Sequence, residues 1–129
     1  MISDYNGLDI RIHKLLKKIG MPAHIRGYKF IKEILFKVLE KNDILDWNIT
    51  NLYKIIGKKF NIKGATIERS VRYAIALSMS RCDHNVWSKY FGYSVQDNTT
   101  NSEFIASICD YLKTYHKELF NESNTRKIL

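Results

Sequence analysis

The residues best suited to chemistry in this chain lie in one short stretch, LYKIIGKKFNIKGATIERSVR, which runs from Leu52 to Arg72. Its apolar spacing predicts two short helices joined by a tight turn, with Ile67 and Val71 buried in the second helix. Burial of those positions leaves a polar face on the second helix. That face consists of Thr66, Glu68, Arg69 and Arg72. Side chains of these types are suited to reading base edges in the major groove of duplex DNA, so the stretch predicts a helix-turn-helix.

Positive charge is concentrated in the same part of the chain. The 129 residues carry a formal net charge of +8, and residues 54–81 alone contain seven basic side chains against a single acidic one. Residues 101–129, in contrast, balance four basic against four acidic side chains. This focus of charge favours a surface that binds a polyanion, and a basic face that serves only solubility is the alternative. Lys58, Lys59 and Lys63 are placed for phosphate contacts, which supply affinity without sequence information.

The remaining sequence predicts an all-α domain of about six helices around one core. One Pro and six Gly leave few positions that interrupt a helix. Apolar residues at helical spacing predict further helices before and after the charged stretch, and these helices hold it in position. Their expected ranges are 8–19, about 28–38, 52–60, about 65–81, 85–91 and 101–115. The domain is expected to span residues 8–118, with a flexible lead-in over 1–7 and a flexible tail over 119–129.

The last of these helices has the clearest start signal. Thr100 and Glu103 have the spacing of a capping box, in which each side chain bonds to the backbone of the other. The inner face of the helix is expected to consist of Phe104, Ile108, Leu112 and Tyr115. The numerous Tyr and Phe of the chain are expected on buried faces or at helix ends. Because stacking on single-stranded bases needs exposed aromatic rings, single-strand binding is the weaker hypothesis.

Catalytic and metal chemistry find little support in the sequence. Cys82, Asp83 and His84 are adjacent, and neighbours in sequence cannot readily close a tetrahedral metal site. No CxxC or HxxxH pair completes such a site, and no phosphate-binding Gly-rich loop or GxSxG nucleophile elbow is present. The sequence therefore predicts a protein that is not an enzyme and has neither a cofactor nor a metal.

The sequence also predicts a cytoplasmic protein. The opening residues lack the apolar region of a signal peptide, and no apolar run approaches the roughly 20 residues that span a membrane. Cys82 and Cys109 are isolated thiols, as in a reducing compartment. Basic helices with an apolar stripe could also lie on a membrane surface. A single core shared by all the helices explains those stripes more simply.

Four separate blocks of the sequence resemble one protein family, in the same order. They are residues 20–28 (GMPAHIRGY), 67–75 (IERSVRYAI), 91–93 (FGY) and 100–106 (TNSEFIA). The chain resembles the DNA-binding effector domain of the stage-zero sporulation protein A family of response regulators, over about residues 8–118. The resemblance implies a six-helix fold with a helix-turn-helix that binds as tandem dimers to DNA boxes related to TGTCGAA.

The resemblance also implies roles for particular residues. The positions matching Glu68, Arg69 and Arg72 face the DNA in this family, and the segment matching about 84–95 contacts the sigma factor of RNA polymerase. Thr66 is a departure, because the family often has an Arg there. The phosphorylatable receiver domain is absent, so the chain is either an effector domain cut from a longer regulator or a relative that naturally lacks the receiver. A protein-interaction module that pairs with a full-length regulator is therefore the alternative function.

Overall fold

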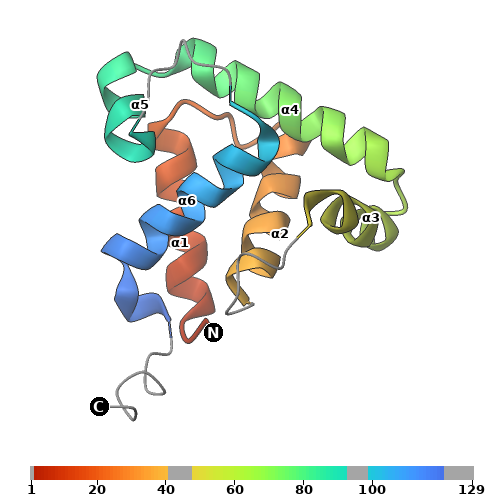
Figure 1. The fold of residues 1–129 in the computed structure, drawn as a ribbon, viewed down its shortest axis with the longest axis horizontal. Helices are drawn as coiled ribbons and strands as arrows, with labels where there is room; N and C mark the ends of the chain where they lie inside the picture. The colour runs from red at the N-terminus through yellow and green to blue at the C-terminus, as the bar shows by residue number, and fades with distance from the viewer. Residues whose placement is uncertain (1, 41–47, 93–98, 121–129) are drawn as a thin grey trace.

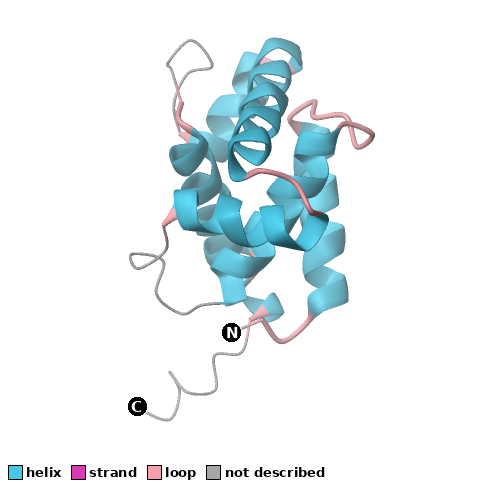
Figure 2. Cartoon of the chain, turned by 90° about the vertical axis from the view of Figure 1, so that its right-hand side faces the viewer, coloured by secondary structure: helices cyan, strands magenta, loops and turns pink. Residues whose placement is uncertain are grey.

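The structure is a computed structural model that describes residues 2–40, 48–92 and 99–120, and these residues form the all-α fold that the sequence predicts. Figure 1 shows one long helix crossing the top of the molecule, with the others packed below and beside it. Figure 2, turned by 90°, shows helices joined by loops around a shared interior. The described elements are α1 (Tyr5–Lys18), α2 (Arg26–Glu40), α3 (Ile49–Phe60), α4 (Gly64–Arg81), α5 (His84–Phe91), α6 (Asn101–Tyr115) and the 3-10 turn η2 (Lys117–Leu119).

Helices α3 and α4 form the predicted helix-turn-helix. Helix α3 ends at Phe60 and is capped by Asn61, whose φ of 56° lies in the left-handed region that Asn tolerates better than most residues. The N–H of Ile62 then donates to the carbonyl of Gly57, which closes the turn. Ile67 and Val71 are fully buried, as predicted. The recognition helix expected at about 65–81 begins one residue earlier, at Gly64, and ends at Arg81.

Helix α4 is packed against α2, α3 and α6, so the core itself fixes the orientation of the recognition helix. The crossing with α2 is especially close, because a Cβ added at Gly27 would lie 2.3 Å from the carbonyl oxygen of Ser70. Only a residue without a side chain allows the two backbones to approach this far. Ser78, also on α4, is buried and donates to the carbonyl of Ile19 at 2.5 Å. These contacts tie α4 to the first half of the chain.

The amino-terminal end of the fold differs from the prediction. The sequence predicts a flexible lead-in over residues 1–7, whereas α1 begins at Tyr5. Asp4 caps the helix by accepting from the N–H of Gly7 at 2.9 Å, and Ile2 is buried and pairs with Phe120. Apolar periodicity does not predict this start, because the helix begins with a short polar turn. Residues 121–129 of the predicted tail lie outside the described residues.

Helix α6 confirms its predicted start, but one residue of its predicted inner face is not buried. The N–H of Glu103 donates to Thr100 Oγ1 at 3.1 Å, and the N–H of Thr100 donates to Glu103 Oε1 at 3.0 Å, which completes the capping box. The inner-face prediction is wrong for Tyr115, whose side chain is 67% exposed. The helix ends there, and Leu119 of η2 is the next buried side chain. The buried face of α6 includes Phe104, Ile108 and Leu112, as predicted.

Gly57 offers a direct test of how tightly the turn is built. A Cβ at this position would lie 2.3 Å from the carbonyl oxygen of Ile62, a backbone atom that cannot yield without moving the turn. We expect Gly57→Ala to lower the free energy of unfolding by at least about 1 kcal/mol in a denaturant titration. Gly64→Ala is the matched control, because its Cβ would meet no atom closer than 3.5 Å. Equal stability of the two variants would contradict the close contact.

Candidate nucleic-acid interface

One side of α4 carries an exposed stripe that faces away from the core. Arg69 and Arg72 are exposed on it, and both are among the residues predicted to read bases. Ala65 and Ala76 are exposed at its two ends. Spacings of three and four residues place these side chains along one line of the helix. The small alanines leave the guanidinium groups as the furthest-reaching atoms of the stripe, which suits contact with the floor of a groove.

Glu68 holds the guanidinium group of Arg72. Nη1 of Arg72 donates to both carboxylate oxygens of Glu68, at 2.8 and 3.1 Å. The sequence leaves two roles open for Glu68, acceptance from a cytosine amino group or orientation of an arginine. In the protein without DNA the glutamate has the second arrangement. An exposed pair one helical turn apart adds little stability, so its effect is to limit the positions that the Arg72 head can occupy.

Thr66 and Arg69 lie beside a hollow between α4 and the loop that enters α2. We call it the α2–α4 hollow. It is lined by His24, Ile25, Arg26, Gly27, Thr66, Arg69, Ser70 and Tyr73. Thr66 is half-buried here, on the flank of the exposed stripe and not at its centre. The hollow therefore brings two basic side chains, Arg26 and Arg69, to the same side of the recognition helix.

Six residues of this hollow are absent from the sequence-based site, and Tyr73, His24 and Arg26 are the three with large polar side chains. Tyr73 was expected on a buried face or at a helix end, and this is wrong because its side chain is 62% exposed. Its position four residues after Arg69 is the signal that could have placed it on the same face. Nothing local in the sequence places His24 and Arg26 beside α4. Their proximity follows from the close crossing of α2 and α4 at Gly27.

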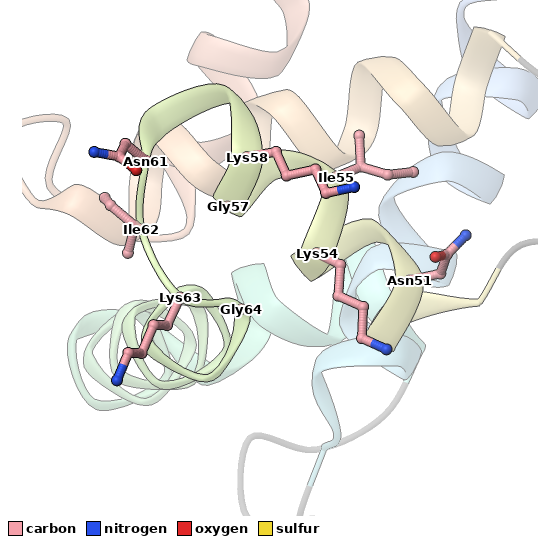
Figure 3. Close-up of a pocket in the computed structure, with 9 residues that line it drawn as sticks. All are labelled: Asn51, Lys54, Ile55, Gly57, Lys58, Asn61, Ile62, Lys63 and Gly64. Atoms are coloured by element: carbon pink, nitrogen blue, oxygen red, sulfur yellow. The ribbon is translucent and has the colours of Figure 1, made fainter.

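A second hollow lies between α3 and the start of α4, and we call it the α3–α4 hollow. Its lining includes three lysines, and among its described residues there is no acidic side chain. Figure 3 shows the side chains of Lys54 and Lys63 extending on either side of Gly64, where α4 begins. The amino-terminal N–H groups of a helix attract anions, so the start of α4 and the lysines would attract the same anion. The residues lining the hollow are Asn51, Lys54, Ile55, Gly57, Lys58, Asn61, Ile62, Lys63 and Gly64.

The three predicted phosphate-contacting lysines are therefore separated by the structure. Lys58 and Lys63 line the α3–α4 hollow, whereas Lys59 is directed to α2. Its Nζ lies 2.8 Å from Glu33 Oε1 and 5.5 Å from the centre of the Phe60 ring. A phosphate role for Lys59 stays a prediction that these contacts do not support. Lys54 lines the hollow instead, although the sequence pattern assigns it no individual role.

Three further features of the described residues concern metal ligands, membrane spans and thiols. Among them, no group of three or more His, Cys, Asp or Glu side chains is arranged to hold a metal ion. No described helix is both long enough and apolar enough to cross a membrane. Cys82 and Cys109 are both buried, and burial raises the pKa of Cys109 to about 12. That thiol is therefore protonated and unreactive near neutral pH, as expected for a core residue.

Comparison with known families decides what this surface belongs to. Residues 12–112 match the family described as the sporulation initiation factor Spo0A C terminal. The match covers more than half of the chain and includes both helices of the helix-turn-helix. The chain belongs to this family. The resemblance inferred from the sequence blocks is thereby confirmed, and the protein is a DNA-binding effector domain of a sporulation regulator. The exposed stripe of α4 accordingly lies on the helix-turn-helix of a transcription-regulating domain.

Proposed function

We propose that α4 enters the major groove of duplex DNA at boxes related to TGTCGAA and that the bound domain regulates transcription there. The observation that carries this proposal is the exposed pair Arg69 and Arg72 on a helix flanked by two basic hollows. An α-helix fits the major groove, and a guanidinium group can donate to both O6 and N7 of a guanine. The box contains guanines on both strands, so each arginine has a suitable acceptor.

The two hollows assign the remaining contacts. The α3–α4 hollow lies at the amino-terminal end of α4, and the α2–α4 hollow lies further along the helix, beside Thr66, Arg69 and Tyr73. Lys54, Lys58 and Lys63 would bind phosphates at the first hollow, and Arg26 at the second. Phosphate contacts of this kind fix the orientation of the helix and supply affinity without sequence information. Glu68 would orient Arg72, and Thr66 would border the groove.

A comparison of two duplexes tests the proposal. The domain should bind a TGTCGAA duplex more tightly than a duplex of the same composition in scrambled order, measured by gel shift at fixed salt. Equal affinity for the two would contradict sequence-specific recognition. Binding to neither would favour the alternative, a module that acts by pairing with a full-length regulator.

We also propose, from the family resemblance, that two copies bind tandem boxes in the cytoplasm and that the segment 84–95 contacts the sigma factor. Helix α5 supports the second point because its polar residues His84, Asn85, Ser88 and Lys89 are exposed. Residues 93–95 of the segment lie outside the described residues. An exposed helix next to the DNA-binding unit is available to a protein partner while α4 occupies the groove.

Thr66 gives a test of the departure from the family pattern. Because Thr66 lies beside Arg69 on the flank of the stripe, an arginine there would add one charged contact to DNA. We expect Thr66→Arg to strengthen binding to the family box and to steepen the slope of log K against log salt by about 0.9. The gain should be largest on boxes with a guanine at the facing position. Unchanged affinity on every box would remove Thr66 from the interface.

A further inference from the structure

A single side chain joins the first turn of α6 to both helices of the helix-turn-helix. Nδ2 of Asn101 donates to the hydroxyl oxygen of Tyr53 on α3 at 2.9 Å. The same nitrogen donates to the backbone carbonyl of Glu68 on α4 at 3.3 Å. An amide nitrogen has two hydrogens, so it can serve both acceptors at once. Asn101 therefore bridges α3, α4 and α6 at one point.

This bridge is contiguous with the charged pair on the recognition helix. Tyr53 is buried, and burial is the main reason why the pKa of its phenol is raised. The hydrogen bond from Asn101 lowers that pKa, the charge of Glu68 raises it and the charge of Arg72 lowers it, so both charges lie within electrostatic reach of the hydroxyl. In an α-helix the carbonyl of residue 68 is also the acceptor for the N–H of residue 72. The bridge thus fixes the helical turn that carries Arg72.

We infer that Asn101 is a positioning residue for DNA recognition, which sets the rotation of α4 and thereby the direction of the Arg72 side chain. The inference rests on the proposed function, since it assigns the residue a role in base discrimination. Base contacts depend on the placement of a guanidinium group to within a fraction of a hydrogen-bond length, whereas lysine contacts with phosphates tolerate displacement. Loss of the bridge should therefore weaken sequence discrimination and leave phosphate binding in place.

The test measures the ratio of affinities for the box duplex and the scrambled duplex. Asn101→Ala should reduce that affinity ratio by roughly 2- to 10-fold. A change of this size corresponds to the net free energy of one hydrogen bond. Asn101→Asp should narrow the ratio at least as much, because it places carboxylate oxygens against the Glu68 carbonyl. Aspartate is favoured in the first turn of a helix, so this variant keeps the start of α6 stable. Affinity for scrambled DNA and its salt slope should stay at the wild-type values in Asn101→Ala, which changes no charge.

Two further variants separate positioning from a purely structural role. Tyr53→Phe keeps the buried ring and removes only the hydroxyl, so it should narrow the ratio without loss of the fold. Ser102→Ala changes the next residue of α6 and should leave the ratio unchanged. The midpoint of thermal unfolding is measured first for each variant. The binding assay is then run well below that temperature, so that only folded proteins are compared.

The outcomes distinguish this inference from the function on which it rests. An unchanged ratio in the Asn101 and Tyr53 variants would overturn the positioning role while leaving sequence-specific binding intact. Equal losses on both duplexes would assign Asn101 to the stability of the domain and would also overturn it. A wild-type protein that does not discriminate between the duplexes would overturn the proposed function, and the positioning role with it.

Discussion

Arg72→Ala and Arg69→Ala are each expected to weaken binding to the box duplex by about 1–3 kcal/mol, a factor of roughly 5 to 150. The reason is that both side chains are exposed on the stripe of α4, where a bidentate contact with a guanine would be lost. The loss on scrambled DNA should be smaller, because no matched base edge is given up there. Competition binding of the two duplexes at one salt concentration measures the difference directly.

Controls for this prediction come from the same helix. Arg81→Ala removes an exposed charge at the last residue of α4 and should leave the discrimination between duplexes unchanged. Glu68→Ala frees the guanidinium of Arg72 and should reduce discrimination by less than Arg72→Ala does, since the contact remains possible. If the Arg69 and Arg72 variants lose the same factor on both duplexes, the two arginines are phosphate contacts and the assignment of base reading is wrong.

The parts of the fold that the sequence predicts well are those decided by local interactions. Ile67 and Val71 recur at helical spacing and are buried, and Thr100 and Glu103 form their capping box within one turn. Such signals depend only on neighbours three or four residues away, so they survive whatever the rest of the chain does. The same holds for the exposure of Arg69 and Arg72, which follows once the buried face of α4 is known.

The parts of the site that the sequence could not predict depend on distant partners. Lys58 and Lys59 are adjacent and chemically identical, but Lys59 lies outside the α3–α4 hollow and pairs with Glu33 on α2. Arg26 reaches the side of α4 because Gly27 allows a close crossing of backbones. These placements are set by packing between helices, which a single sequence does not reveal through periodicity.

The affinity for DNA is expected to depend steeply on salt concentration. Changes in this dependence are expected to show which lysines contact phosphates. Four phosphate contacts, from Lys54, Lys58, Lys63 and Arg26, give a slope of log K against log salt of about −3.6, at about −0.9 for each contact. A rise from 50 to 200 mM salt should then weaken binding by about 150-fold. Titrations on the scrambled duplex measure this slope without any contribution from base contacts.

Single substitutions then test which lysines contribute. Lys58→Ala and Lys63→Ala should each make the slope shallower by about 0.9, because each would remove one phosphate contact. Lys59→Ala removes the same charge from the neighbouring residue, but its ammonium group is paired with Glu33, so the slope should stay at the wild-type value. A shallower slope for Lys59→Ala would mean that DNA breaks that ion pair, and a wild-type slope near zero would contradict a phosphate-binding surface altogether. Comparison of the Lys58 and Lys59 variants thus distinguishes a specific phosphate contact from a general effect of positive charge.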